Sequence, residues 1–185
     1  PLSIIDDCQE GLSLVGKRYE TGEYFISGLI MAGEILEQVM TLIKPEFKND
    51  KYTQSKGCIL LGTVEGDIHD LGKNILSILL TCRGFTVHDL GVDVPPSVFL
   101  QKTKDIHPDI VGLSGLLTIS YKKMKETIDL LEKDAPQIPI VIGGGQTNEQ
   151  VATLVGAKLW SKNAIDGVNL FQKLLSGKDL APKEM

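Results

Sequence analysis

From residue 57 onward the chain alternates between short apolar runs and longer amphipathic segments. Five such pairs follow one another, and repeated strand–helix pairs are typical of a parallel sheet with helices on both faces. The apolar runs predict strands at 58–63, 85–89, 109–114, 138–142 and 158–160. The segments after them predict helices near 71–83, 97–104, 121–133, 148–155 and 164–175. The predicted fold class is therefore α/β, a five-stranded parallel Rossmann-like sheet with the flavodoxin-like strand order.

The residues before the sheet predict a pair of amphipathic helices between positions 2 and 44. Apolar residues there recur every three or four positions, which is helical spacing. They are Leu12, Val15 and Tyr19 in the first helix and Phe25, Leu29, Ala32, Leu36, Val39 and Ile43 in the second. Two such helices cannot bury their apolar stripes alone, so we expect them to pack on each other and on another part of the chain.

Residues 45–56 are polar and charged, which predicts a linker. We therefore expect a helical region with its linker at 1–52 and a sheet domain at 53–185. The tail from Gly177 is expected to be frayed.

Composition narrows the function classes. The 185 residues carry a formal net charge of −5, which argues against a nucleic-acid binder with its usual basic face. No apolar stretch reaches membrane-spanning length, and no signal peptide is visible, so we expect no membrane partner and a cytoplasmic location. The three cysteines, Cys8, Cys58 and Cys82, form no CxxC pair, which indicates packing roles in a reducing compartment.

The loop after the first predicted strand contains side chains that a turn alone does not require. Asp67 and His69 flank one apolar residue, and Gly72 follows, where we expect it to let the chain turn into the helix. A carboxylate two residues before a histidine can take one ring N–H and leave the other nitrogen as a lone-pair donor. The alternatives are a surface histidine, a turn role for Asp67 and a helix N-cap role for Asp70.

In a sheet of this strand order, ligands bind at the carboxyl ends of strands one and three. The loops after those strands should therefore face each other. Small residues at 114, 115, 118 and 120 and the glycine triplet at 143–145 would leave a slot there, wide enough for a flat group. The alternatives are ordinary loop hydroxyls and a tight glycine turn.

The sequence does not match the common motifs of nucleotide-binding, hydrolase and zinc sites, because each motif requires residues that are absent here. Gly72-Lys73-Asn74 lacks the hydroxyl of a P-loop, and the run after Gly143 lacks the last glycine of G-x-G-x-x-G. Leu116 stands where a hydrolase elbow needs glycine. A zinc site needs three or four ligands, and His88 and His107 sit at the ends of other strands. A single histidine suits a metal whose remaining ligands come from a macrocycle.

The stretch from Gly66 to Asn74 resembles the Asp-x-His-x-x-Gly signature of cobalamin-binding domains. Two further motifs follow in order, Ser114-Gly115-Leu116-Leu117-Thr118 and Gly143-Gly144. The family is that of the corrinoid methyl-carrier proteins of methyltransferase systems, with the cobalamin module of methionine synthase. The resemblance covers nearly the whole chain, because Gly22-Glu23-Tyr24-Phe25 is similar to the family's helical cap. That cap has four helices and this chain shows about two, so the resemblance implies a cap that is N-terminally incomplete.

The resemblance also implies roles for particular residues. His69 would be the lower axial ligand of cobalt and displace the cofactor's dimethylbenzimidazole, Asp67 would hold its other nitrogen, and Ser120 would extend this relay. Phe25 and Leu29 would shield the methyl face, with packing in the cap core as the alternative. The implied cofactor contacts are Gly66, Asp67, Ile68, His69, Asp70, Gly72, Ser114, Leu116, Thr118, Ser120, Gly143, Gly144, Ala164 and Glu10. No catalytic residue is implied.

The implied function is a corrinoid protein that carries a methyl group on cobalt, with methylcobalamin as the loaded cofactor. Its implied partners are a methyl-donor-specific methyltransferase, a methyltransferase for an acceptor such as tetrahydrofolate or coenzyme M, and a reductive activator of cobalt(II). Such a carrier is not expected to turn over alone. The alternatives are a cobalamin-binding regulatory or mutase-type module and, more distantly, a flavodoxin-like electron carrier.

Overall fold

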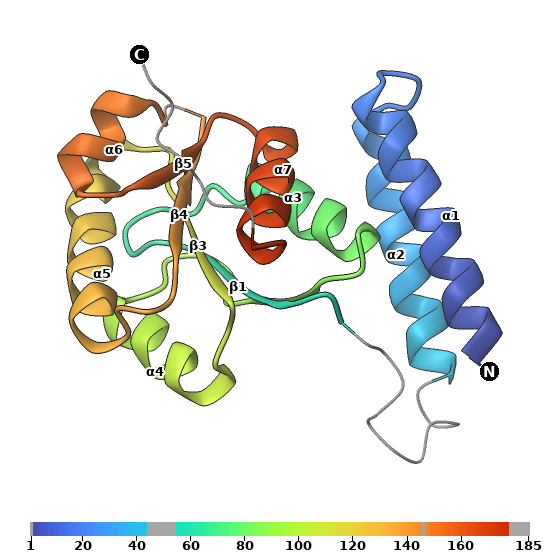
Figure 1. Ribbon diagram of the computed structural model, residues 1–185. Helices are drawn as coiled ribbons and strands as arrows, with labels where there is room; N and C mark the ends of the chain where they lie inside the picture. Colours follow the sequence, from blue (N-terminus) through green and yellow to red (C-terminus); the bar gives the residue numbers. More distant parts are fainter. Residues whose placement is uncertain (1, 44–54, 146, 178–185) are drawn as a thin grey trace.

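The computed structural model describes residues 2–43, 55–145 and 147–177. Its centre is a parallel sheet with the strand order β2-β1-β3-β4-β5, the flavodoxin-like order that the sequence predicts (Figure 1). The strands are β1 (Cys58–Thr63), β2 (Thr86–Asp89), β3 (Ile110–Ser114), β4 (Ile140–Gly143) and β5 (Leu159–Ser161). Each pairs in parallel with its neighbours. The α/β prediction is therefore confirmed, with β1 and β3 adjacent at the centre.

Helices cover both faces of the sheet. One face carries α3 (Leu71–Cys82) and α7 (Ala164–Leu175), and the other carries α4 (Pro96–Ile106), α5 (Tyr121–Asp134) and α6 (Glu149–Val155). The predicted boundaries differ from these by at most two residues, as where β4 begins at Ile140. The sequence did not predict the short 3-10 helix η2 (Thr118–Ser120), which precedes α5.

The side chains of β1 alternate between the two layers of the core. Leu60 packs with Phe99 of α4 and Met124 of α5, whereas Ile59 and Leu61 pack with α3 and α7. All these side chains are buried, as expected for a central parallel strand covered on both faces. The same alternation leaves Thr63, at the carboxyl end of β1, on the α3 and α7 side.

The two N-terminal helices, α1 (Leu2–Glu20) and α2 (Ile26–Ile43), form an antiparallel hairpin on the outer flank of α3 (Figure 1). The contact is close: a Cβ built on Gly16 would lie 3.5 Å from Cys82 Cβ, and one on Gly33 would lie 3.4 Å from Ile78. The predicted helix pair is confirmed, and its partner is α3. The linker predicted at 45–56 lies mostly outside the described residues, as does the domain boundary at 52, so that division stays a prediction.

The two hairpin residues predicted to shield a cofactor behave differently. Leu29 is buried in the core between hairpin and α3, whereas Phe25 is 84% exposed in the turn before α2. The hairpin that carries both residues packs on α3. The packing alternative therefore holds for Leu29.

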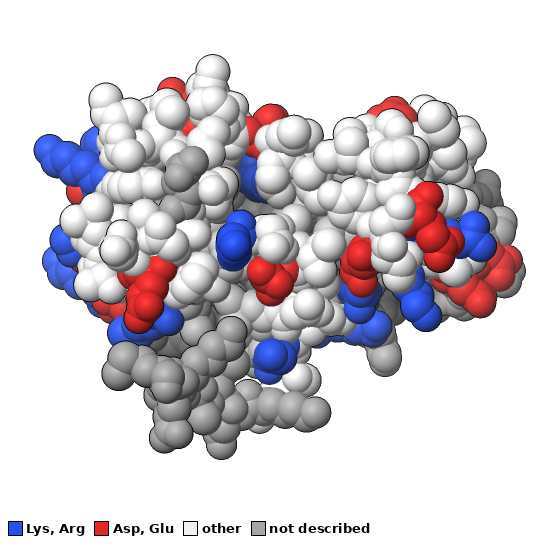
Figure 2. Space-filling view, turned by 90° about the horizontal axis from the view of Figure 1, so that it is seen from above, with Lys and Arg blue, Asp and Glu red and all other residues white. Residues whose placement is uncertain are grey.

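Two of the cysteines and the charges on the surface are placed as the composition predicts. Burial raises the pKa of the Cys82 thiol to about 12, so Cys82 is an inert packing residue. Burial, and then Asp109, also raise the pKa of Cys58. On the face shown in Figure 2, acidic and basic groups are interspersed among uncharged residues. No helix in the described parts of the chain is long and apolar enough to cross a bilayer.

Candidate functional site

Asp67 and His69 form a directly bonded pair at the carboxyl end of β1. His69 Nδ1 lies 2.7 Å from Asp67 Oδ1, and the His69 backbone N–H donates to the same oxygen over 3.0 Å. The Asp67 residue is 1% exposed, whereas the His69 side chain is 48% exposed. With Nδ1 donating to the carboxylate, Nε2 is the ring nitrogen left with a lone pair.

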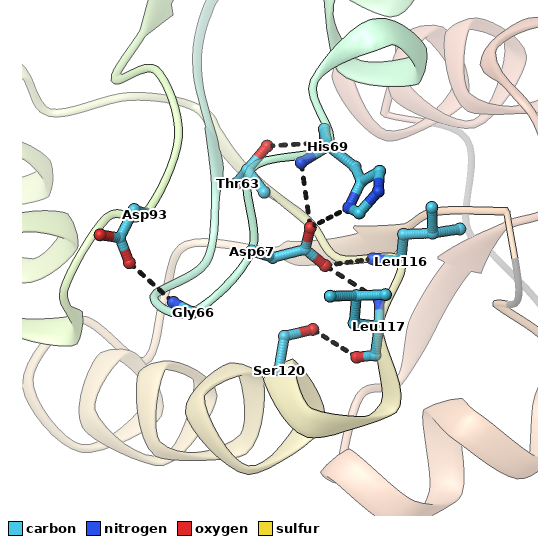
Figure 3. A network of polar contacts seen from close by, with 8 residues as sticks. All are labelled: Thr63, Gly66, Asp67, His69, Asp93, Leu116, Leu117 and Ser120. Atoms are coloured by element: carbon cyan, nitrogen blue, oxygen red, sulfur yellow. Dashed lines mark hydrogen bonds and ion pairs between the residues drawn. The ribbon is translucent and has the colours of Figure 1, made fainter.

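The second oxygen of Asp67 ties this loop to the loop after β3 (Figure 3). Asp67 Oδ2 accepts the backbone N–H groups of Leu116 and Leu117, over 2.6 and 2.9 Å. Burial by itself raises the pKa of Asp67, but hydrogen bonds from Leu117, His69 and Leu116 outweigh it and hold the pKa at about 2. Asp67 is therefore a buried anion that joins the two loops at the switch point, which is more than a turn residue does.

Ser120 is connected to Asp67 through one peptide unit. Its hydroxyl donates to the Leu117 carbonyl over 2.7 Å, and Leu117 N–H donates to Asp67 (Figure 3). Ser120 is fully buried. The family resemblance implies a relay of Asp67 and Ser120; in the structure both side chains hydrogen-bond to the backbone of Leu117.

A second set of contacts holds the His69 loop from the other side. Asp93, with φ of 54°, accepts the N–H of Gly66 over 2.7 Å and donates its own N–H to the Asp67 carbonyl over 3.0 Å. The hydroxyl of Thr63 donates to the His69 carbonyl over 3.3 Å. Sequence reasoning missed Asp93; its signal is an aspartate in the turn between Gly91 and Pro95. These contacts fix the backbone that carries His69.

The expectation that Gly72 turns the chain into the helix is wrong. Gly72 lies within α3 and does not have a positive φ. Gly66, with φ of 84°, makes the turn instead. A Cβ on Gly72 would meet nothing within 4 Å, so the fold itself does not require glycine there. Asp70 occupies the N-cap position of α3, but its side chain makes no capping hydrogen bond.

A cavity of about 320 Å³ opens beside the loop, between the carboxyl ends of the strands and helices α3 and α7. Of the predicted cofactor residues, it is lined by Gly72, Ser114, Gly143, Gly144 and Ala164. The other predicted residues of the β1 and β3 loops do not line the cavity: Gly66, Asp67, Ile68, His69, Asp70, Leu116, Thr118 and Ser120. Glu10 is exposed on α1 and is not among the lining residues. The predicted slot is thus present, and the contacts of all these residues with a cofactor stay predictions.

Sequence reasoning missed several lining residues, among them Tyr19, Lys73 and Ser161. Tyr19 reaches the cavity from α1, and Ser161 ends the short strand β5. Lys73 is buried at the start of α3, where its ammonium group pairs with Asp89 of β2 and donates to Asn74 over 2.9 Å. A lysine beside the glycine of the loop motif was the available signal for Lys73. The other two depend on packing between distant elements.

Within the described residues, no group of three or more His, Cys, Asp and Glu side chains could hold a metal ion. A metal bound at His69 would therefore take the rest of its ligands from another molecule. Nε2 of a half-exposed histidine beside a cavity suits a metal that arrives in a macrocycle.

Comparison with known proteins identifies the family. The family described as B12 binding domain matches residues 57–163, and a second family with the same description matches residues 1–44. The chain belongs to the B12-binding corrinoid proteins. Corrinoid protein DSY3155 of Desulfitobacterium hafniense is 37% identical over 94% of this chain and 84% of that protein. Dimethylamine corrinoid protein 2 of Methanosarcina acetivorans is 34% identical over 91% of this chain and 79% of that protein.

Two solved structures resemble this corrinoid protein. A cobalamin-binding protein from Desulfitobacterium hafniense is 45% identical, with a TM-score of 0.66 over 90% of this chain and 78% of that one. A chain in the methanol:cobalamin methyltransferase complex MtaBC from Methanosarcina barkeri is 27% identical, with a TM-score of 0.88 over 96% of this chain and 69% of that one. Of these two structures, the one with the higher TM-score is therefore the one with the lower sequence identity.

The residues present fit a corrinoid. His69 offers one nitrogen, the buried Asp67 fixes its ring, and the open side of Gly72 leaves room beside it. Gly143 and Gly144 add no side chain to the cavity wall, which leaves space for a flat base. The motif that the sequence shares with cobalamin-binding domains thus coincides with a site of the right shape and donor chemistry.

Proposed function

We propose that this chain carries a methyl group on the cobalt of a bound corrinoid, between a methyltransferase that loads it and one that unloads it. The observation that supports this most is His69, anchored by buried Asp67 beside a cavity for the cofactor's tail. When bound, the corrinoid supplies a cobalt atom that can accept a methyl group and release it. The names of the relatives, a dimethylamine corrinoid protein and a chain of a methanol:cobalamin methyltransferase complex among them, agree with this proposal.

The chain's own residues position and expose the site. Asp67 keeps Nδ1 protonated so that Nε2 can bind metal, and it can stabilise the imidazolium when His69 takes up a proton. The loops on either side are locked through Leu116, Leu117 and Asp93, so the position of His69 is fixed before any ligand binds. This preorganisation lowers the cost of ordering the site on binding.

The position of the helical hairpin leaves the His69 loop accessible. Large apolar side chains at Ile68, Leu71 and Ile119 are exposed around it. In our proposal this open side admits the methyltransferases, and the better fit to a chain from a methyltransferase complex supports it. The sequence led us to expect that the hairpin covers the site; we propose that it does so between transfers and moves on the linker near residues 45–56. We also propose that a reductive activator of cobalt(II) is a partner of this protein and that the protein is cytoplasmic.

The carrier proposal predicts that the isolated chain does not turn over. The corrinoid-loaded protein with its cobalt reduced to cobalt(I) should demethylate no donor at catalytic rates. Adding a donor-specific methyltransferase should give one methyl transfer per corrinoid, seen as a change in the visible spectrum. Free cobalamin with the same methyltransferase is the control. Multiple turnovers by the isolated chain would overturn the carrier proposal.

The cavity wall gives a second prediction. Gly143→Leu should lower the affinity for cobalamin about 5- to 140-fold, since overfilling a packed site typically costs about 1–3 kcal/mol. Affinity for cobinamide, which lacks the nucleotide tail, should not change. Both are measured by absorbance titration. Gly144 is unsuitable for this test, because its φ is 144° and a Cβ would lie 2.0 Å from the Gly115 carbonyl oxygen.

Gly11→Leu is the matched control for this test, because Gly11 lies on α1 with nothing within 4 Å of its Cβ position. That variant should bind both corrinoids as the unchanged chain does. Equal loss of cobalamin and cobinamide binding in Gly143→Leu would show that the cavity does not hold the tail.

A further inference from the structure

Lys73 is a buried charged residue that the site described so far does not explain. It lies in the first turn of α3, and its side chain is 3% exposed. A cation at this place is unfavourable for two reasons: burial removes it from water, and the N-terminal turn of a helix carries a partial positive charge. The fold can therefore accommodate the Lys73 ammonium only because acceptors surround it.

The acceptors of Lys73 come from β2 and from the next residue of α3. Asp89, the last residue of β2, forms an ion pair with the ammonium, and the side-chain oxygen of Asn74 accepts from it over 2.9 Å. The other carboxylate oxygen of Asp89 accepts the N–H of Gly91 over 2.8 Å. Asp89 thus joins the first turn of α3 to the loop between β2 and α4, residues 90–95.

The loop between β2 and α4 also holds the chain before His69. Its Asp93 accepts the N–H of Gly66 over 2.7 Å (Figure 3). Gly66 precedes His69 in the sequence, and Lys73 follows it. The chain is therefore fixed on both sides of His69, before it through Asp93 and after it through Asp89.

Fixing both sides matters for a residue that is to bind a metal. A metal ligand must be held within about 0.5 Å of its productive position, and a site that is ordered before binding loses less free energy when the metal arrives. Only a few residues separate His69 from Lys73, so a shift of the first turn of α3 would displace the imidazole. Outer contacts that orient a ligating histidine typically change metal affinity about 10- to 100-fold.

We propose that Lys73 and Asp89 are positioning residues for the cobalt ligand, because their ion pair holds the first turn of α3 so that His69 Nε2 stays where it can bind the metal. This rests on the proposed function, since it requires a corrinoid whose cobalt is bound by His69. The effect of the pair on the cofactor passes through His69, so it should disappear when His69 is absent.

Four proteins test this by absorbance titration with cobalamin. The double variant Lys73→Met/Asp89→Asn removes both charges together, so neither is left buried without its partner. It should bind cobalamin about tenfold more weakly than the unchanged chain. His69→Ala is titrated with and without the same two substitutions, which should cause no further loss there. An equal loss in both backgrounds, or an unchanged affinity in the double variant, would overturn the positioning role.

Arg83→Met/Glu20→Gln is the matched control, because Arg83 and Glu20 form a partly buried ion pair over 2.6 Å at the other end of α3. It should keep the cobalamin affinity of the unchanged chain, and thermal unfolding should show that both double variants are folded. A tenfold loss in this control would show that any ion pair on α3 has the effect, and would also overturn the proposal.

Asp89→Asn alone is the milder variant, because it keeps the contact of Lys73 with Asn74. It should also weaken cobalamin binding, and this loss should likewise vanish when His69→Ala is present. A loss that persists there would contradict the positioning role even if the double variant does not fold. Failure of the unchanged chain to bind cobalamin would instead overturn the proposed function.

Discussion

Replacing His69 by alanine should remove the histidine-ligated form from the spectrum of the cobalamin-loaded protein and leave the fold intact. Nε2 is the ring nitrogen that can bind cobalt, and no other described histidine has a carboxylate within salt-bridge distance. The ring is half exposed and its one described polar contact is with Asp67, so the variant should lose only about 1 kcal/mol of stability. Visible spectra and thermal unfolding measure the two effects separately.

Electron paramagnetic resonance of the cobalt(II) form sharpens this test. One axial nitrogen splits the cobalt lines into triplets, and labelling the protein's histidine with nitrogen-15 should change these to doublets. His88→Ala is the control, because His88 is an exposed histidine on β2. It should keep the histidine-ligated spectrum. Persistence of that spectrum in His69→Ala, or triplets after labelling, would show that another nitrogen binds cobalt.

The sheet could be predicted because the pattern that marks each strand and each helix lies within one continuous stretch of the sequence. The central strands β1, β3 and β4 are runs of mainly apolar residues, and the helices repeat apolar residues at their own period, so type and order follow without tertiary contacts. The pair Asp67 and His69 was predictable for the same reason, since two residues in one tight loop must lie close together. The switch point then followed from the strand order.

Contacts between loops that are far apart in the sequence could not be predicted in this way, because they leave no pattern within either loop. The groups that donate to Asp67 from the β3 loop are backbone N–H groups of Leu116 and Leu117, which every residue except proline possesses. The role of Gly72 was misread, because a glycine that leaves space and one that makes a turn look alike in a sequence. Ser161 lies in a strand of three residues, and only the register shows that it faces Gly143.

The placement of the hairpin could not be derived for a different reason. The helix α2 buries Leu29 against its neighbours, yet Met31, Ile35 and Leu42 on another side are exposed. An apolar pattern on two sides does not indicate which one packs on α3. Amphipathicity therefore predicted that the helices pack, but could not fix where they lie relative to His69.

Asp67→Asn should lower the free energy of unfolding at pH 7 by about 2–4 kcal/mol. Four N–H contacts converge on this carboxylate, two on each oxygen. In the amide one of these oxygens is replaced by an NH₂ group, which cannot accept a hydrogen bond, so two donors lose their acceptor. Chemical denaturation measures the difference.

The pKa of Asp67 also fixes how this difference depends on pH. The folded-state pKa is about 2, below the ordinary 3.8, so the carboxylate's contribution is fully present above about pH 4. It is lost as the pH falls through 2, and the gap between the unchanged chain and Asp67→Asn should narrow by about 2 kcal/mol between pH 4 and pH 2. Asp70→Asn is the control, because Asp70 is exposed and makes no capping bond. Parallel stability curves for the unchanged chain and Asp67→Asn would show that Asp67 is not the buried anion.

The same variant should change the pH at which His69 leaves cobalt in the loaded protein. An ionised carboxylate stabilises the imidazolium that forms when the ring is protonated, and a neutral amide does not. In Asp67→Asn the loss of the histidine-ligated spectrum should therefore need a lower pH than in the unchanged chain. Asp70→Asn should titrate as the unchanged chain does, because its carboxyl makes no bond to the ring. Identical titrations of all three proteins would separate Asp67 from the protonation of His69 and leave it a purely structural anchor between the β1 and β3 loops.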